Sequence, residues 1–481
     1  ARASALRMNL ISSSLHIKQK CLNTISTQGN PLSAISGNGH SAGAAQHLSS
    51  IRTVTVGIGI SPIQSLIIRE SRTVTAGRES HPALRDIHFG WQMYGNFPNF
   101  ATVMKEIRHI VISDPHDCCG CTACASACPR GCISMKDHQE GFLYPEVNTE
   151  LCIECGLCVK VCPVQARYPA RRPLAVYAVK HPDGQVREGS ASGGAFPLLA
   201  AAVLKDGGLV FGSRFDSAME AVHDCASAPE EVHPFIGSKY LQSRMEDCYG
   251  KVRKALKEGR KVLFTGTPCQ VAGLNHYLGS IPDHLLTAEL ICHGAPSPGV
   301  WRQYLREEIQ RLEDRGYRNV RIDNVRFRDK DGSGWKGYHF RIFFSAVDPD
   351  GKPCRPVLSE PGKAANLFIR GFLADLYSRP SCYRCPAREL RSGSDLTIGD
   401  FWGIGDLRPD FDDDRGVSAV LVNTEKGRKI FNGLDCIRME MSYEDVLRRN
   451  RCLEQSVAEP AGRAAFFAST DSIHDTIRRL I

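Results

Sequence analysis

Cysteine spacing is the feature that most constrains how this chain can fold. Ten of its 20 cysteines lie within residues 118–162. Eight of these repeat one pattern twice: Cys118, Cys121, Cys124 and Cys128 before Pro129, then Cys152, Cys155, Cys158 and Cys162 before Pro163. Two residues separate the first three cysteines of each run, and three residues precede the fourth. This pattern holds two [4Fe–4S] clusters in bacterial ferredoxins, where the fourth cysteine of each run binds the other cluster.

The exchange of the fourth cysteine predicts the two ligand sets. One cluster is assigned to Cys118, Cys121, Cys124 and Cys162, and the other to Cys152, Cys155, Cys158 and Cys128. Cys119 and Cys132 are extra, and we interpret them as structural. Residues 133–147 predict two short strands around a glycine turn. Structural zinc sites are the alternative, but zinc has no use for the third cysteine or the Cys-Pro ending.

Charge and length narrow the function classes. The 481 residues suffice for two or three domains. Residues 1–110 contain 11 Lys and Arg against 4 Asp and Glu, whereas the rest of the chain contains 49 against 48. The nearly neutral body gives nucleic-acid binding no electrostatic support. No apolar run of about 18 residues occurs, so no membrane span is expected. Many cysteines in a long chain without a recognisable signal peptide indicate metal in a reducing compartment, so a cytoplasmic location is expected.

Residues 1–105 form a leader of unusual composition. No acidic residue precedes Glu70, while Ser, Thr, Gly and Ala are abundant. This composition is typical of an organelle transit peptide. It also fits translated non-coding sequence upstream of a true start near Met93 or Met104. Because the chain begins with Ala, we favour the second interpretation and expect the leader to be disordered or artefactual.

The body of the chain alternates strand and helix patterns. Strands are predicted at residues 174–180, 209–215, 261–267 and 284–294, and helices between them. Thr267 and Pro268 fit the N-cap and first position of one such helix. Residues 320–400 are more β-like, and residues 243–259 show helical spacing that ends at a glycine. The predicted fold class is α/β (α+β), with a two-cluster ferredoxin-like domain before a mixed α/β body.

Four further cysteines stand at the ends of predicted elements in this body. Cys269 follows one strand, Cys292 ends the next, and Cys382 and Cys385 form a Cys-x2-Cys pair. Neighbouring parallel strands bring their C-terminal ends together. The four thiolates suffice for a third [4Fe–4S] cluster. They also suffice for zinc, or they are unrelated thiols, and a helix N-terminus could make Cys269 a reactive nucleophile.

Several motifs together resemble one family. They are "SASGGAF", "GSKYLQS", "VLFTGTPCQVAGL", "CHGAPSP", "FRDKDGSGW" and "CYRCPARELRSGSDLTIGDFWG". They resemble the beta subunits of coenzyme F-420 hydrogenases and dehydrogenases, a family that includes formate dehydrogenase beta subunits and 7-hydroxymethyl chlorophyll a reductase. Bacterial members with a fused N-terminal 2[4Fe–4S] domain look most similar. The resemblance covers roughly residues 112–440. It implies FAD in the body and a third cluster held by Cys269, Cys292, Cys382 and Cys385.

The resemblance also suggests where a flavin would bind. A Ser/Gly-rich loop at a helix start suits a pyrophosphate, and a second loop offers a cation and an aromatic ring beside Gly237. A third loop follows a buried strand. The candidate residues are Ser190, Ser192, Gly193, Gly194, Ser238, Lys239, Tyr240, Thr265, Gly266 and Thr267. The alternatives are an ordinary helix cap for the first loop and a solvated charge for Lys239.

Catalytic residues are not assigned from sequence. His293 and Lys239 are the candidates, although a single histidine at a strand end is more often structural. Asp400 lies between glycines that would allow close approach to a cofactor, or that simply form a turn. Trp335 could stack near a substrate or pack in a sheet. The substrate does not transfer from the family, because not every member that uses the deazaflavin coenzyme carries the ferredoxin domain.

The predicted organisation is a leader (1–105), a ferredoxin domain (110–170), two parts of the body (173–255 and 256–440) and a C-terminal extension (441–481). The expected function is that of an iron–sulfur flavoprotein oxidoreductase, which exchanges electrons between [4Fe–4S] clusters and a flavin that reduces or oxidises an organic substrate or deazaflavin coenzyme. The expected protein partner is a ferredoxin or another redox protein. The alternatives are a non-catalytic electron-transfer subunit and a zinc-dependent binding module.

Overall fold

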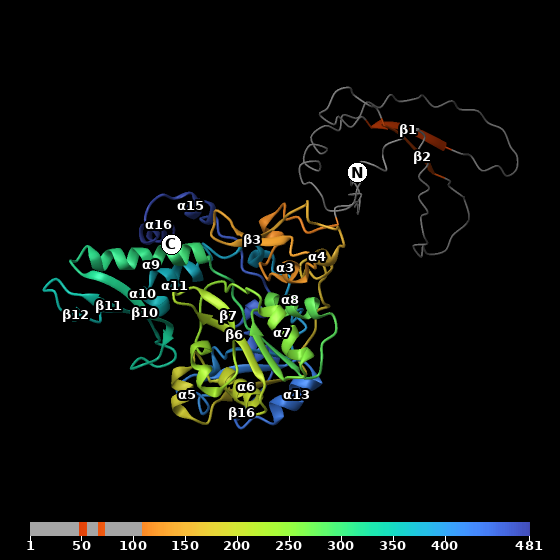
Figure 1. Ribbon diagram of the computed structural model, residues 1–481. Helices are drawn as coiled ribbons and strands as arrows, with labels where there is room; N and C mark the ends of the chain where they lie inside the picture. Colours follow the sequence, from red (N-terminus) through yellow and green to blue (C-terminus); the bar gives the residue numbers. More distant parts are fainter. Residues whose placement is uncertain (1–47, 55–65, 73–107) are drawn as a thin grey trace, which may run out of the picture. The chain divides into compact units, whose positions relative to one another are not determined.

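The computed structural model describes residues 48–54, 66–72 and 108–481 (Figure 1). The chain divides into two units, Ala1–Met104 and Lys105–Ile481. In the first unit, strands β1 (Leu48–Val54) and β2 (Leu66–Arg72) pair antiparallel. The rest of the predicted leader lies outside the described residues. All further elements belong to the second unit.

The cysteine-rich segment contains two similar halves. Each half has a short helix after its first cysteines and contributes one strand to a hairpin. Strands β3 (Ile133–Asp137) and β4 (Leu143–Val147) pair antiparallel, which confirms the predicted strands. Helices α3 (Ala123–Ala127) and α4 (Leu157–Lys160) each follow a residue in the left-handed region. A short 3-10 helix, η1 (Pro115–Asp117), precedes them.

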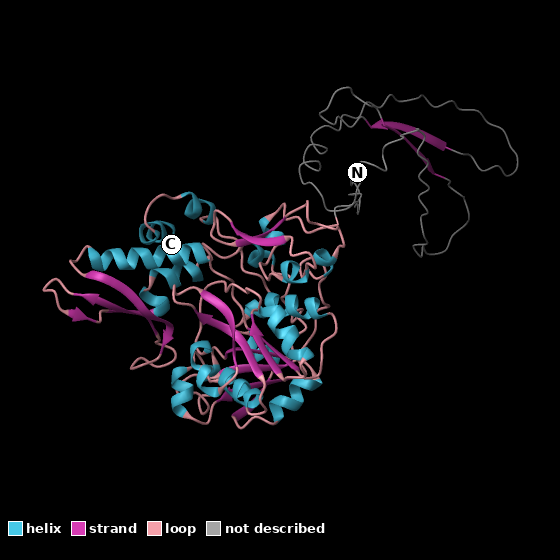
Figure 2. Cartoon of the chain, in the orientation of Figure 1, coloured by secondary structure: helices cyan, strands magenta, loops and turns pink. Residues whose placement is uncertain are grey.

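A mixed eight-stranded sheet forms the centre of the body (Figure 2). Its order is β16-β5-β15-β14-β9-β8-β6-β7, in which β14, β9, β8 and β6 are mutually parallel and the other pairings are antiparallel. The bounds are β5 (Ala175–Lys180), β6 (Leu209–Phe215), β7 (Ala221–Ala226), β8 (Val262–Gly266), β9 (Leu285–Leu290), β14 (Leu396–Asp400), β15 (Ser418–Val422) and β16 (Ile437–Met441). The mixed α/β fold class is confirmed, and one sheet takes strands from both predicted parts of the body.

Helices cover both faces of this sheet. One core joins α6 (Ala195–Leu204) and α13 (Glu425–Asn432) to one face, and another joins α7 (Cys248–Lys257) and α8 (Pro268–Leu278) to the other. Cys119, Cys121 and Ala123 belong to the second core, so the ferredoxin domain packs directly on the body. Every residue of β8 is buried, as expected for a central parallel strand.

A smaller antiparallel sheet packs beside a helical layer. It contains β10 (Arg318–Asp329), β11 (His339–Val347), β12 (Pro353–Cys354) and β13 (Val357–Pro361). A core around Trp301 joins it to α9 (Pro298–Glu313), α11 (Leu367–Leu373), α15 (Arg463–Ala468) and α16 (Ile473–Leu480). The remaining elements are α5 (Gly184–Gly189), η2 (Pro229–Glu231), η3 (His233–Phe235), α10 (Gly362–Ala365), η4 (Pro380–Arg384), α12 (Ile404–Leu407), α14 (Tyr443–Leu447) and η5 (Arg451–Leu453).

Two expectations about local structure need correction. The helical pattern assigned to residues 243–259 starts five residues late, at Cys248, because Arg244 exchanges backbone hydrogen bonds with Ala221 and His223 of β7. The β-like segment 320–400 also contains α11, which starts where the Asn366 side chain accepts a hydrogen bond from the Ile369 amide.

Gly193 offers a stability test. A Cβ atom at this position would overlap the Val179 carbonyl oxygen and the Ser418 amide nitrogen. Gly193→Ala is therefore expected to lower the free energy of unfolding by about 1–3 kcal/mol, as overpacking does. Thermal unfolding measures this loss. Gly189→Ala is the matched control, because a Cβ atom there meets no atom within 4 Å. An equal effect of both substitutions would contradict the prediction.

Candidate functional site

The structure brings together the first predicted set of ferredoxin cysteines. Burial, together with the facing Cys118 and Cys162 thiols, raises the pKa of Cys124 to about 12. Cys121 also faces Cys124 and Cys162. Neutral thiols are thus favoured in the absence of metal, and cluster binding would have to displace their protons. These four thiols from two separate runs share one site, as the exchanged fourth cysteine requires.

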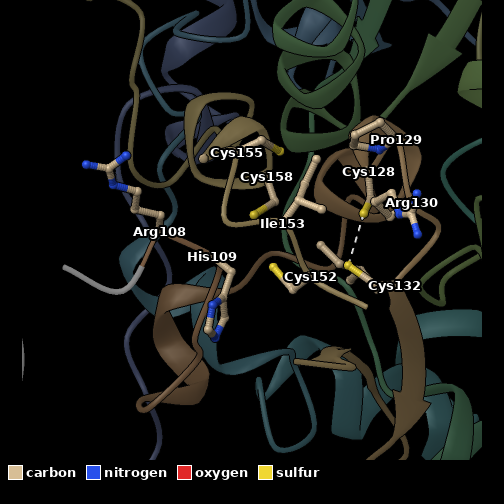
Figure 3. Close-up of a pocket in the computed structure, with 12 residues that line it drawn as sticks. Arg108, His109, Cys128, Pro129, Arg130, Cys132, Cys152, Ile153, Cys155 and Cys158 are labelled. Carbon is tan, nitrogen blue, oxygen red and sulfur yellow. Dashed lines mark hydrogen bonds between the residues drawn. The ribbon is translucent and has the colours of Figure 1, made fainter. Parts of the chain in front are cut away.

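The second predicted set lines a small pocket (Figure 3). The pocket contains Cys128, Cys132, Cys152, Cys155 and Cys158. Backbone amides of Ile110 and Glu154 donate to the sulfurs of Cys158 at 3.2 Å and Cys152 at 3.4 Å. Such N–H donors suit the sulfur atoms of a cluster. Cys132, interpreted from sequence as structural, also lines this pocket, where its sulfur lies 3.2 Å from that of Cys128.

The four body cysteines also lie together. Cys269 is in the first turn of α8, where Thr267 is the N-cap, as predicted, and forms a capping box with Gln270. Cys292 follows β9, while Cys382 and Cys385 lie in and just after η4. Burial, together with the facing Cys385 and Cys269 thiols, raises the pKa of Cys382 to about 12. Cys292 faces the same three thiols. The donor set therefore fits a cluster, whose four ligands must surround it.

A buried cation that sequence analysis missed lies beside this third set. Arg388 donates to the backbone oxygens of Cys292 at 2.5 Å and His293 at 2.9 Å. Burial alone would lower the pKa of Arg388. The facing thiols, among them those of Cys385 and Cys292, outweigh this effect, so that the pKa is raised above its usual value. A guanidinium here would offset the negative charge of a thiolate-bound cluster.

A site for a single metal ion would need its ligands closer together than a site for a four-iron cluster does. Within the described residues, no group of three His, Cys, Asp or Glu side chains converges as the ligands of one metal ion would. A cubane instead holds its cysteine sulfurs apart at its corners.

The first predicted flavin loop is fixed against β15. The Ser192 hydroxyl donates to the Val417 oxygen at 2.7 Å, and the Gly193 amide donates to Ser418 Oγ at 2.9 Å. Ser190 donates to the Val186 oxygen at 2.7 Å. Gly194 is the N-cap of α6 with φ at 88°. The loop is thus held rigidly at the start of a ten-residue helix.

In the second predicted flavin loop, the Lys239 and Tyr240 side chains have different surroundings. Lys239 Nζ contacts the backbone oxygens of residues 234–237 at 3.0–3.3 Å, and burial lowers its pKa to about 7. Its donors are therefore engaged within its own loop. Tyr240 contacts the ring of Phe327 edge-on at 5.4 Å and faces Arg328, near Ser238.

The third loop and His293 have internal partners. Thr265 Oγ1 donates to the Phe211 oxygen at 3.0 Å, and Thr267 lies 3.2 Å from the Cys269 sulfur. Gly266 ends β8 between them. His293 Nε2 lies 3.0 Å from Asp375 Oδ1. These contacts support structural roles for Thr265 and His293.

Arg328 on β10 is the functional candidate that sequence reasoning did not single out. Its side chain is 1% exposed and donates to Asp400 at 2.5 Å, while its Nε and Nη2 atoms have no hydrogen-bond partner among the described residues. The guanidinium lies over the rings of Tyr338 at 4.6 Å and Trp402 at 4.8 Å. Two buried nitrogen donors without acceptors require an explanation, such as an anionic or carbonyl-bearing ligand. The motifs "FRDKDGSGW" and "IGDFWG" were the available signal.

Neighbouring groups complete this arrangement. Trp335 Nε1 donates to Asp400 Oδ1 at 3.1 Å, and its ring stacks on Trp402 with centroids 4.8 Å apart. Lys330 Nζ contacts the backbone oxygens of Ser192 and Arg415 at 3.2 and 2.6 Å. Lys330 therefore joins the first flavin loop to the strand that carries Arg328.

Comparison with known proteins agrees with this architecture. Residues 117–166 match the model of a 4Fe-4S dicluster domain, and residues 259–443 match that of the C terminus of the coenzyme F420 hydrogenase/dehydrogenase beta subunit. The chain thus matches the models of a dicluster ferredoxin domain and of the C terminus of this family of beta subunits. It is accordingly an iron–sulfur electron-transfer protein related to oxidoreductase subunits.

Individual relatives extend the match. The F subunit of the F(420)H(2) dehydrogenase of Methanosarcina mazei is 23% identical over 68% of this chain and 84% of its own length. The coenzyme F420-dependent sulfite reductase of Methanocaldococcus jannaschii is 46% identical over 8% of this chain and only 7% of its own. A chain of the F420-reducing [NiFe] hydrogenase complex of Methanosarcina barkeri aligns over 59% of this chain and 90% of its own, with 17% identity and a TM-score of 0.37. Among the described residues, no helix is both long and apolar enough to cross a membrane.

Proposed function

We propose that this chain is an iron–sulfur flavoprotein oxidoreductase with three [4Fe–4S] clusters and one FAD. Clusters exchange single electrons, whereas a flavin converts between one- and two-electron chemistry. The ferredoxin cysteines would hold two clusters, and Cys269, Cys292, Cys382 and Cys385 would hold the third. The chain would thereby take electrons from a redox partner and deliver them in pairs to an organic substrate, or run in reverse.

The observation that carries this proposal is the shared edge of the parallel strands. The pairs Gly266↔Glu289 and Leu290↔Ile398 align the C-terminal ends of β8, β9 and β14. Cys269 and Cys292 follow the first two ends, and Asp400 ends the third. Cys269 and Cys292 of the third set and the Arg328–Asp400 pair therefore lie at the same edge of the sheet, which is where α/β proteins bind ligands.

The residues around Arg328 fit a flavin chemically. The two unpartnered N–H groups of Arg328 offer donors to a carbonyl or phosphate oxygen, and Tyr240 and Trp402 offer aromatic surfaces. The N-terminus of α6 adds backbone N–H groups suited to a pyrophosphate. Asp400 holds the guanidinium in place. These groups would bind and orient the flavin, while burial keeps water from it.

The deazaflavin coenzyme F420 is the first substrate class to test, because the relative that covers most of this chain is named for that coenzyme. A non-catalytic electron-transfer subunit is the second candidate function. It is favoured by the same relative's name, which describes one subunit of a dehydrogenase.

An anaerobic reductive titration of the complete protein tests the proposal. Three clusters and one flavin would accept about five electrons per chain, one for each cluster and two for the flavin. Oxidation of reduced F420 by the protein, with a one-electron dye as acceptor, would support the substrate class. Uptake of about three electrons without flavin absorbance would instead favour the non-catalytic subunit.

Cys124→Ser tests the ferredoxin assignment. Loss of one ligand is expected to remove one of three clusters, so that iron falls by about a third. Flavin content should not change, because Cys124 is in the ferredoxin domain. Iron and flavin analysis of the purified variant measures both. Cys354→Ser, at a half-buried cysteine on β12, is the control. Unchanged iron in Cys124→Ser would reject the ligand set.

A further inference from the structure

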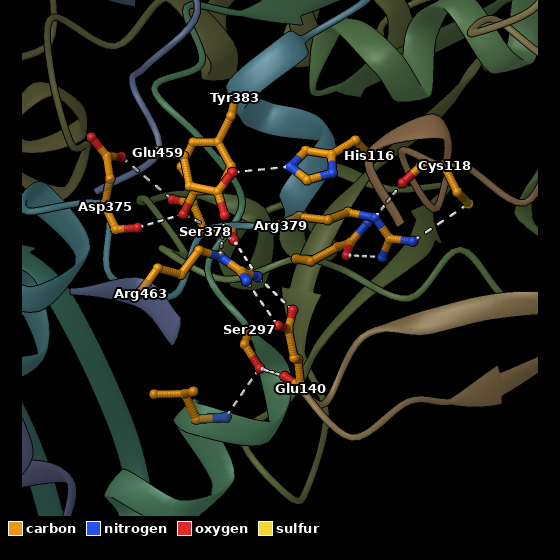
Figure 4. Close-up of polar contacts among 12 residues, drawn as sticks. His116, Cys118, Glu140, Ser297, Asp375, Ser378, Arg379, Tyr383, Glu459 and Arg463 are labelled. Carbon is orange, nitrogen blue, oxygen red and sulfur yellow. Dashed lines mark hydrogen bonds and ion pairs between the residues drawn. The ribbon is translucent and has the colours of Figure 1, made fainter. Parts of the chain in front are cut away.

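Arg379 lies beside Cys118 of the first ferredoxin site (Figure 4) and immediately precedes η4, which carries Cys382 of the third cysteine set. Its side chain is 1% exposed although it carries a charge. It reaches residues more than 230 positions earlier in the chain. The guanidinium donates from Nε to the Cys118 oxygen at 2.7 Å, and from Nη2 to the Cys118 sulfur at 3.4 Å and the Leu143 oxygen at 2.9 Å.

The remaining contacts hold the guanidinium in place. Nη1 donates to Gln242 Oε1 at 2.9 Å, and Gln242 in turn donates to the Cys119 oxygen at 3.0 Å. The Tyr144 ring centroid lies 4.3 Å from the guanidinium carbon. Gly120 must lack a side chain, because a Cβ atom there would lie 2.7 Å from Arg379 Nη1.

Among the described residues, no Asp or Glu side chain forms an ion pair with Arg379. The groups that face it and raise its pKa are Cys118, Tyr144, Cys119 and Cys382, while burial acts in the opposite direction. Arg463 provides a contrast in the same region, because it forms an ion pair with both oxygens of Glu140. A buried cation is costly unless an anion compensates it. Thiolates bound to a cluster would supply that anion.

The backbone of Arg379 reaches the third set. Its carbonyl oxygen accepts from the Cys382 amide at 2.8 Å, and its own amide donates to the Ala295 oxygen at 2.9 Å. The Ala295 amide donates to the Cys382 sulfur at 3.4 Å. Cys119 lies in the same gap, where its thiol is hydrogen-bonded with those of Cys121 and Cys269. Arg379 therefore contacts a ligand of each site directly.

We propose that Arg379 is a positioning residue that raises the reduction potential of the cluster bound through Cys118 and aligns that cluster with the third cysteine set. Reduction adds one negative charge to a cluster. A nearby buried cation and a hydrogen bond to its sulfur ligand favour the reduced state. The proposal rests on cluster binding by Cys118, which the dicluster domain match supports independently of the third cluster and the flavin.

An EPR-monitored redox titration of the complete, anaerobically reconstituted protein tests this role. In Arg379→Gln, the midpoint potential of one ferredoxin cluster is expected to fall by about 59 mV. For a one-electron couple this corresponds to about a tenfold decrease in the equilibrium constant for reduction. Arg379→Lys should show a smaller fall, because an ammonium keeps the charge but cannot reproduce the planar fork. Arg463→Gln is the matched control, since it removes another buried arginine that contacts the ferredoxin domain but no cysteine.

The outcomes separate tuning from a structural role. Full iron with unchanged midpoints in Arg379→Gln would overturn the proposal. Loss of iron in Arg379→Gln with wild-type midpoints in Arg379→Lys would also overturn it, since Arg379 would then act only in folding. Loss of iron in Arg379→Gln together with a lowered midpoint potential in Arg379→Lys would support the proposal. A wild-type protein with only two clusters and no flavin would refute the proposed function, yet leave this midpoint shift expected.

Discussion

Cys385→Ser is expected to lower the iron content from about twelve to about eight atoms per chain, because one of three four-iron clusters is lost. Cys385 faces Cys269 and Arg388 within the half-buried third set. Serine is a poor ligand for a cluster, and three remaining thiols would leave one corner open. Flavin should stay bound, and reduction by a one-electron donor should stop at the ferredoxin clusters. Iron and sulfide analysis, combined with EPR of the reduced protein, measures the loss.

The control for this prediction is Cys436→Ser. Cys436 is a half-buried body cysteine near α13, outside the three cysteine sets. It should retain all iron. If Cys385→Ser also retains all iron, the third cluster does not exist and the four thiols have another role.

Arg328→Lys is expected to weaken FAD binding by about tenfold to a hundredfold, the cost of losing charge-assisted hydrogen bonds. Lysine can keep an ion pair with Asp400, which limits damage to the fold. It removes the guanidinium Nε and Nη2 donors, which have no hydrogen-bond partner among the described residues. Fluorescence of flavin released after dialysis against limiting FAD measures the change.

Arg326→Lys serves as the matched control for Arg328. Arg326 is on the same strand, but its side chain is 52% exposed and pairs with Asp329. This substitution should leave FAD affinity unchanged. Equal affinity in Arg328→Lys and wild type would place the flavin elsewhere and leave the free N–H groups of Arg328 unexplained.

The ferredoxin domain could be predicted from sequence because its ligands are close along the chain. Within residues 118–162, spacing alone determines which thiols can surround a cubane. The capped helix after β8 was predictable for a similar reason, since Thr267 and Pro268 are local signals. Both features depend on short-range geometry.

The third set and the buried arginines depend on tertiary structure. Cys269 and Cys292 follow the neighbouring parallel strands β8 and β9, whereas Cys382 is in η4, more than 100 positions after Cys269. Arg379 contacts Cys118 across 261 positions, which no local pattern encodes. Lys239 shows the converse, because its sequence context suggested a ligand contact while the carbonyl oxygens of its own loop take its donors. The direction of a long side chain follows from packing, which the sequence pattern alone does not determine.

Quantification of iron and of the chromophore that heat releases from anaerobically purified protein tests the central claim most directly. Three four-iron clusters and one flavin would give about twelve iron atoms and about one FAD per chain. About eight iron atoms with no flavin would contradict the central claim. The chain would then be a two-cluster relay, and the two-electron chemistry would belong to a partner.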